Sequence, residues 1–246
     1  MLKNLLFIVY FSFLGCGSNT STNSQNQPIE TSSPSTPSPT TTPTSKPSIR
    51  HYINNNKCDQ VLDKVFYSVC YDYSLKAPLA VGYTLSGDLV NELNIVKRPY
   101  YKVEYAIEKK YRASKDDYVG TGYDRSHIGA DAAFDWSQES LDSVYSLVNI
   151  MPQARKVNRY TWTKAERLER ILAVQLGEVS VVNLLLYTKN PKRIGSNRIA
   201  VPKGIYKIFF NHEKKYKKCL YYENDNNIIT SEDRLTNHQV NCSEIE

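Results

Sequence analysis

Side chains that could cleave a phosphodiester bond are concentrated between residues 124 and 170. They comprise one imidazole, one amide, one carboxylate and several guanidinium groups, on His127, Asn158, Glu166, Arg125 and Arg170. An imidazole can take a proton from water near neutral pH, whereas amide and carboxylate oxygens are ligands for a hard cation. Guanidinium groups bind phosphate oxygens. The block therefore predicts metal-assisted hydrolysis of a phosphodiester.

Asn158, Trp162, Glu166 and Arg170 recur at intervals of four residues. Each such step turns a helical side chain by only about 40° around the axis, so the four side chains would share one stripe of a helix. The alternative is an exposed helix face on which Glu166 and Arg170 form an ion pair worth a few tenths of a kcal/mol. That alternative explains Asn158 and Trp162 less well, because neither is a preferred residue of helix surfaces.

His127 is the candidate base, and its setting differs from that of the other three histidines. His51 and His238 lie in segments that look exposed and terminal, and His212 lies in a lysine-rich loop. A single histidine beside glycines is by itself more often a polar loop residue than a catalytic one. The residues that accompany His127 are therefore what indicates catalysis.

Together these residues resemble the DNA/RNA non-specific endonucleases, the Serratia-type nucleases with a ββα-metal site. Residues 124–127 read D-R-S-H where this family has D-R-G-H, and its Asn-x3-Trp-x3-Glu-x3-Arg helix follows at 158–170. The intervening segment 149–153, N-I-M-P-Q, is similar to the family's N-x-x-P-Q stretch. Ser126 is the one plain departure. Glycine permits a positive φ, which serine adopts only at a cost, so a loop that needs this conformation would displace His127.

The resemblance implies a role for each residue near the metal. His127 would be the general base that takes a proton from water, which attacks phosphorus in line. Asn158 would be the single protein ligand of Mg²⁺, with Mn²⁺ as a possible replacement, and water molecules would complete its coordination. Glu166 would hold those water molecules in place.

The resemblance also implies roles for the arginines. Arg170 would bind a non-bridging phosphate oxygen. The family uses a further arginine upstream of the histidine, for which Arg98 is the best candidate by its distance along the chain and Arg125 the weaker one. The partners would be DNA and RNA, cleaved with little sequence specificity to leave 5′-phosphates, because phosphate contacts carry no sequence information. No protein partner is predicted.

Two other functions remain open at this point. One is a non-catalytic surface lipoprotein that binds nucleic acid on a nuclease scaffold, and the other is a phosphodiesterase for small nucleotides or lipid head groups. The formal net charge of +6 is compatible with a polyanionic partner but does not establish one. The basic segments 189–198 and 214–218 would add salt-dependent affinity or would simply be solvated loops.

The N-terminal region predicts export. Residues 1–15 read as a lipoprotein-type signal peptide, with a short apolar core and Gly15 directly before Cys16. Lipid on Cys16 would anchor the protein to a membrane, although Phe13 departs from the usual pattern and leaves ordinary secretion open. Residues 16–50 form a Ser-, Thr- and Pro-rich tether that we expect to be disordered, and 51–246 form the nuclease domain. The expected location is therefore the outer membrane or cell surface, the periplasm, or the medium.

Cysteine usage agrees with export. Besides Cys16 the chain has four cysteines, which in an exported protein suggests two disulfides. Of the three possible connectivities we favour Cys58–Cys70 with Cys219–Cys242, because these pairs close short loops. A metal site of four thiolates is the alternative, but the spacings do not fit zinc-binding cysteine pairs.

The elements that position these residues are mostly strands. Apolar or alternating patterns predict strands at 81–85, 101–107, 144–150, 179–187, 205–210 and 219–222, and a helix at 161–176. The strand 179–187 is apolar at odd and even positions, which is typical of burial on both faces. The pattern predicts an α+β fold: a mostly antiparallel central sheet flanked by helices, with the ββα-metal motif that the resemblance implies.

Overall fold

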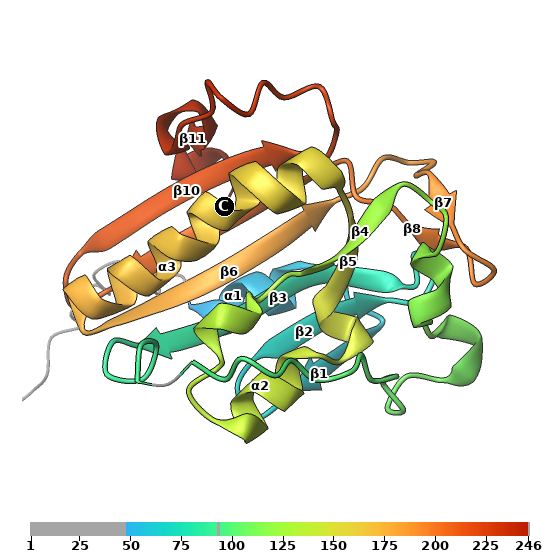
Figure 1. Cartoon of the computed structure of the whole chain (residues 1–246), viewed down its shortest axis with the longest axis horizontal. Coiled ribbons are helices and arrows are strands. Elements are labelled where there is room, and N and C mark those ends of the chain that lie inside the picture. The colour runs from blue at the N-terminus through green and yellow to red at the C-terminus, as the bar shows by residue number, and fades with distance from the viewer. Residues whose placement is uncertain (1–47, 93, 246) are drawn as a thin grey trace, which may run out of the picture. The chain divides into compact units, whose positions relative to one another are not determined.

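A single large antiparallel sheet organises the described part of the chain, with its strands in the order β1-β2-β3-β6-β9-β10-β11 (Figure 1). The strand bounds are β1 (Gln60–Asp63), β2 (Ser68–Asp72), β3 (Ala77–Ser86), β6 (Glu178–Leu186), β9 (Gly204–Asn211), β10 (Tyr216–Glu223) and β11 (Gln239–Val240). Two short antiparallel ribbons lie outside it: β4 (Tyr123–His127) with β5 (Ile150–Ala154), and β7 (Arg193–Ile194) with β8 (Ile199–Ala200). The α+β class and the antiparallel sheet are confirmed.

The computed structural model describes residues 48–92 and 94–245. The predicted signal peptide, the lipid site at Cys16 and nearly all of the predicted tether lie outside these residues. Helix α1 (Ile49–Asn55) begins two residues before the predicted start of the domain. Within the described residues, no helix is both long enough and apolar enough to span a membrane.

The central strands are buried on both faces. Val181 in β6 and Phe209 in β9 belong to one apolar core, whereas their neighbours Val182 and Ile208 belong to another. Successive side chains of a strand point to opposite faces, so each strand contributes to both cores. This confirms the two-sided burial predicted for 179–187.

Helices cover both faces of the sheet. Helix α3 (Trp162–Leu176) lies along one face, where Figure 1 shows it running in nearly the same direction as β6 and β10, and α2 (Gln138–Val144) belongs to the same core. Helix α1 packs against the other core through Tyr52 and Ile53. The predicted helix is confirmed to within one residue, and it ends at Gly177, whose φ of 84° few other residues adopt.

The connections contain many short helical turns. A π-helix (Val157–Thr161) directly precedes α3. The 3₁₀ turns are Lys109–Tyr111, Lys115–Tyr118, Asp131–Ala133, Leu147–Asn149, Leu235–His238 and Cys242–Glu244.

Two predicted strands are wrong. Residues 101–107 form no strand, because their only ladder contact among the described residues is an isolated bridge between Lys102 and Ser146, and Tyr105 is 77% exposed. An alternating pattern cannot become a strand without a neighbouring edge to pair with. Residues 144–150 instead contain the end of α2 and a 3₁₀ turn, and strand β5 begins only at Ile150. Pro152 lies inside β5, which is tolerated because this two-stranded ribbon leaves one side of each strand unpaired.

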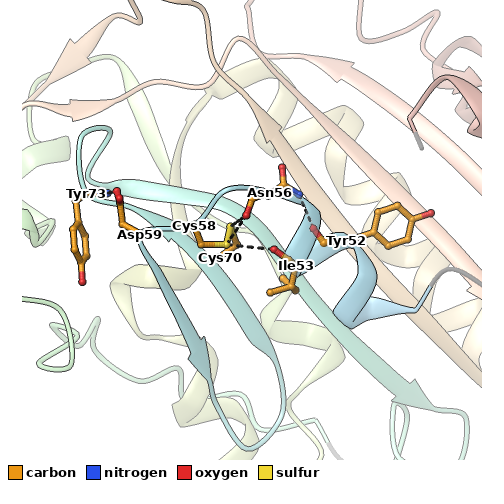
Figure 2. The surroundings of a disulfide bond; sticks show 7 residues. All are labelled: Tyr52, Ile53, Asn56, Cys58, Asp59, Cys70 and Tyr73. Atoms are coloured by element: carbon orange, nitrogen blue, oxygen red, sulfur yellow. Dashed lines mark hydrogen bonds between the residues drawn. A yellow bond between two sulfur atoms is a disulfide. The ribbon is translucent and has the colours of Figure 1, made fainter.

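Both predicted disulfides are present. Cys58–Cys70 joins the segment after α1 to β2, and Figure 2 shows it beside Ile53 and Asn56 at the end of that helix. Cys219–Cys242 joins β10 to the C-terminal 3₁₀ turn. Their Cα–Cα distances are 5.2 and 5.4 Å, within the ordinary range. The two bonds thus fasten the N-terminal and C-terminal parts of the described chain to the central sheet.

Candidate active site

His127 is presented by the β4–β5 ribbon, where it pairs with Ile150. The neighbouring Ser126 pairs with Met151 and lies within regular strand structure. Among the described residues other than glycine, positive φ occurs only at Lys76, Arg198 and Lys215. Serine at position 126 therefore carries no backbone penalty here.

Aromatic rings surround the His127 imidazole. Tyr101 stacks on it with ring centroids 5.7 Å apart, and Tyr145 meets it edge-on at 4.6 Å. Burial lowers the pKa of His127 to about 4; the positive charge of Arg98 acts in the same direction, and the negative charge of Asp131 opposes it. His127 is therefore neutral at pH 7. Its Nε2 is buried and has no hydrogen-bond partner within the described residues.

Arg98 lies beside this imidazole and is held by two carboxylates. Its Nη2 donates to Asp135 at 3.0 Å, and its Nε lies 3.5 Å from Asp131. Asp131 also accepts a 2.9 Å hydrogen bond from the Tyr145 hydroxyl. The Arg98 Nη1 is buried without a partner among the described residues, so this arginine keeps one donor for a further acceptor.

Arg125 lies at the edge of the cluster formed by His127, Tyr101, Tyr145 and Arg98, which we call the His127 cluster. Its guanidinium is 5.1 Å from the centre of the Tyr101 ring, the ring that also stacks on His127. Arg125 and His127 are two residues apart on β4 and so point to the same face of the ribbon. The Arg125 side chain is exposed, and the one hydrogen bond it makes among the described residues is a long 3.4 Å contact to the Lys115 carbonyl. It is thus placed to meet a ligand from solvent.

Asp124 connects the ribbon to Asn158. The Asn158 Nδ2 donates to Asp124 Oδ2 at 3.0 Å, and Arg159 makes two hydrogen bonds of 2.7 and 2.9 Å to the same carboxylate. Hydrogen bonds from Arg159, and then from Asn158, lower the pKa of Asp124 against the effect of burial. Because an ionised carboxylate only accepts hydrogen bonds, it fixes which end of the Asn158 amide faces it. The amide oxygen is left for another ligand.

Asn158 lies in the π-helix rather than in α3 itself. Single π-turns within helices are rare and frequently lie at functional sites. Trp162, four residues later, is fully buried and packs edge-on against Tyr222 at 5.3 Å. The stripe predicted from the spacing of four is therefore not an exposed face, since Trp162 belongs to the core.

Glu166 and Arg170 follow on α3. Burial and the negative charge of Glu169 raise the pKa of Glu166 to about 8, while Lys207 and Arg170 oppose the shift. A carboxyl group in such surroundings is readily ionised by a nearby cation. Arg170 donates to the main-chain oxygen of Glu166 at 3.0 Å, rather than to its carboxylate. This disfavours the simple surface ion pair.

Arg170 and Arg98 line the same open polar cavity of about 500 Å³. Asp135, the partner of Arg98, lines it as well. Two arginines from distant parts of the sequence therefore face one space beside the His127 cluster. A phosphate group in this space would meet donors from both.

Several residues that shape the site were not predicted from the sequence: Asp124, Asp131, Tyr101, Tyr145, Glu169 and Lys207. For Asp124 the available signal was its place as the first residue of the D-R-S-H motif. For Lys207 it was a single lysine in an otherwise apolar strand, 205–210. Tyr101 and Tyr145 stood among 19 tyrosines, so nothing in the sequence distinguished them.

The fold and these side chains define an α+β protein with one group of polar side chains beside its sheet. The β4–β5 ribbon presents the neutral imidazole of His127. The helical segment 157–176 presents the amide of Asn158, the carboxyl of Glu166 and the guanidinium of Arg170. A sequence profile of the DNA/RNA non-specific endonucleases matches residues 45–246. The chain belongs to this family.

Individual relatives agree with this assignment. Human mitochondrial endonuclease G is 26% identical over 159 residues, which are 61% of this chain and 54% of that protein. Nuclease C1 of Cunninghamella echinulata var. echinulata is 25% identical over 199 residues, 75% of this chain and 79% of the relative. The chain thus spans about half the length of its endonuclease G relatives.

A solved structure shares the fold. The crystal structure of the EndoG/EndoGI complex superposes with a TM-score of 0.70, covering 82% of this chain and 89% of the matched chain at 24% identity. At that identity the likeness concerns the fold alone.

Proposed function

We propose that this protein is a metal-dependent endonuclease that hydrolyses DNA and RNA with little sequence specificity and leaves 5′-phosphates. The observation that carries the proposal is the hydrogen bond between Asp124 and Asn158. It links the Asn158 amide to strand β4, which ends at His127. This one short strand therefore carries the candidate base and also orients the candidate metal ligand. Family membership supports the same reaction.

His127 is the proposed general base. Its neutral imidazole can accept a proton from the attacking water, and its pKa of about 4 keeps it unprotonated at neutral pH. The Nε2, which has no partner among the described residues, is a nitrogen that a water molecule or substrate could reach once bound. Tyr101 and Tyr145 restrict the rotation of the ring, which keeps it aimed in one direction.

Asn158 and Glu166 fit a divalent cation. Within the described residues, no three His, Cys, Asp or Glu side chains gather to hold a metal. The freed amide oxygen of Asn158 is a suitable single ligand for Mg²⁺, which keeps most of its water, and Mn²⁺ could replace it. Glu166 would accept hydrogen bonds from that water. When bound, the cation supplies positive charge that stabilises the leaving 3′-oxygen.

The arginines would hold the phosphate. Arg98 and Arg170 line one cavity, so both can donate to the non-bridging oxygens of a single phosphodiester. Arg125, at the exposed edge of the cluster, would bind a neighbouring phosphate. None of these contacts reads a base, which is the reason to expect little sequence specificity.

Export is part of the proposal. We infer that residues 1–15 act as a signal peptide and that a lipid on Cys16 holds the protein at a membrane, with the nuclease on a tether. The two disulfides support an oxidising environment outside the cytoplasm. Radiolabelled palmitate incorporation into the wild type, with Cys16→Ser as the control, tests the anchor.

Digestion of plasmid DNA and of RNA by the purified protein tests the activity. We expect cleavage with Mg²⁺, none with EDTA, and a loss of about a hundredfold or more in His127→Ala. His51→Ala, in helix α1, is the matched control and should cleave as the wild type does. Salt-sensitive binding without any cleavage would instead identify a non-catalytic binding protein, and hydrolysis of bis(p-nitrophenyl) phosphate alone would identify a small-molecule phosphodiesterase.

A further inference from the structure

A buried ammonium group lies between helix α3 and the central sheet. The Nζ of Lys207, in β9, is 2.5 Å from Glu169 Oε2, 3.0 Å from Asn183 Oδ1 and 3.2 Å from the Tyr83 hydroxyl. These four residues are at most 1% exposed. All three donors of the ammonium are therefore used, on partners from α3, β6 and β3.

Stability alone does not explain this arrangement. Removing two charges from water costs several kcal/mol, and apolar side chains of similar volume often serve the fold equally well or better. A hydrogen-bonded ion pair differs from apolar packing in that it depends on orientation, because hydrogen bonds weaken steeply away from their preferred distances and angles. Hydrogen bonds of fixed geometry at Lys207 would therefore restrict the rotation of α3 on the sheet more narrowly than apolar contacts alone.

The contacts of Lys207 on α3 lie on either side of Glu166 and end directly before Arg170. Its ammonium lies 4.8 Å from the centre of the Trp162 ring and also binds Glu169, which is seven residues further along. Seven residues are about two helical turns, and Glu166 lies between the two contacts. Arg170 directly follows Glu169. Any rotation of the helix at this point would move Glu166 and Arg170 together.

The same group of residues reaches the segment that carries His127. Tyr83, which donates to Glu169 at 3.0 Å, packs against Gly129, where a Cβ would lie 3.0 Å from the tyrosine ring. Gly129 is two residues after His127 and is held by a 2.9 Å hydrogen bond from its amide to Asn149. Tyr83 therefore contacts both the helix side and the strand side of the site.

We propose that Lys207 is a positioning residue for the reaction, which sets the placement of Glu166 and Arg170 through Glu169 and Trp162 and aligns them with the His127 segment through Tyr83. The inference rests on the proposed nuclease function. Lys207 has no exposed surface, so it acts without touching substrate.

The test compares Lys207→Met with the double variant Lys207→Met/Glu169→Leu, which removes both charges and keeps the volume. We expect the double variant to fold, with a Tm several degrees below that of the wild type, because Asn183 Oδ1 and the Tyr83 hydroxyl lose buried partners. Its kcat on plasmid DNA should fall about tenfold or more, and the Mg²⁺ concentration for half-maximal rate should rise, because small misplacements of catalytic groups are costly. Lys207→Met alone leaves a buried carboxylate unpaired and should lower Tm further.

Val182→Ala is the matched control. It lies beside Asn183 on β6 but faces the other core, so it should lower Tm and leave kcat and the Mg²⁺ requirement unchanged. The inference is overturned if the double variant keeps wild-type kcat, if it fails to fold by circular dichroism, or if Val182→Ala loses kcat to the same extent. A wild type that cleaves nothing would overturn the proposed function itself, and this inference with it.

Discussion

Asp124 determines the geometry of the candidate metal ligand without being one itself. Its carboxylate accepts from Asn158 and from Arg159, and it lies on the strand that carries His127. Removing a residue that orients a metal ligand typically lowers metal affinity or activity by about 10- to 100-fold. The motif showed that this aspartate stands first in D-R-S-H, but only the structure shows which atom it holds.

Asp124→Ala should therefore weaken metal binding more than it weakens the fold. Without its acceptor the Asn158 amide can rotate, and we expect the Mg²⁺ concentration for half-maximal cleavage to rise about tenfold or more. Asp63→Ala, which breaks the exposed pair with Arg50, is the matched control and should leave the Mg²⁺ requirement unchanged. An unaltered Mg²⁺ titration in Asp124→Ala would contradict this role.

The proposed role of His127 as the base predicts how cleavage depends on pH. A base must be neutral, and burial lowers the pKa of His127 to about 4, so the rate should stay high as pH falls from 8 to about 5 and decline as pH passes through 4. Asp131 raises that pKa, so Asp131→Asn should move the acid limb to lower pH.

These rates must be measured at saturating Mg²⁺. Glu166 has a pKa of about 8 without a cation, so it takes up a proton as pH falls below 8 and metal binding weakens in parallel. A decline of the saturated rate already near pH 6.5, the ordinary pKa of histidine, would show that His127 is not buried as the structure has it.

At the scale of elements, α3 and the central strands could be predicted from the sequence because their patterns are long. The helix carries good helix-forming residues up to Gly177, and β6 is apolar at six of its nine positions. Residues 101–107 also alternate, yet they form no strand, since pairing depends on an edge that lies elsewhere in the chain. The π-helix at 157–161 could not be predicted, because its sequence resembles an ordinary first helical turn.

The end of α3 provides a prediction about stability. Gly177 has a φ of 84°, and no described atom lies within 4 Å of the position that a Cβ would take, so Gly177→Ala would meet backbone strain but no clash. We expect a loss of about 1–2 kcal/mol and a Tm lower by several degrees. Gln175→Ala, at an exposed position of the same helix, should not lower Tm. Equal Tm values for both variants would mean that the helix ends in another way.

At the scale of the whole molecule, the sequence predicted the class, the sheet and both disulfides. What it could not predict was which distant side chains meet. Lys207 in β9 pairs with Asn183 in β6. In the sequence, each is simply a polar residue within a mainly apolar strand. Tyr83 lies 100 residues before Asn183 and 86 residues before Glu169, yet its hydroxyl hydrogen-bonds to both. A local sequence pattern cannot predict contacts between residues so far apart in the chain.

The disulfides should stabilise the whole domain. They close loops of 12 and 23 residues, for which the loss of chain entropy in the unfolded state is worth about 3 kcal/mol each. Reduction should therefore lower Tm in the wild type, and Cys219→Ser/Cys242→Ser should show part of that loss before any reductant is added. A Tm that reductant does not change would contradict this contribution.

The candidate site is divided between strand β4 and the helical segment 157–176, so it forms only when the two pack together. The proposed base lies at the end of β4, whereas the proposed metal ligand and the Glu166 carboxyl lie on a helical segment that begins about thirty residues later, and Asp124 bridges β4 and that segment. Neither element alone carries all of the proposed catalytic groups. The proposed cleavage of DNA would therefore report on tertiary docking: during refolding, helical circular dichroism should recover first, and nuclease activity only when α3 packs on the sheet.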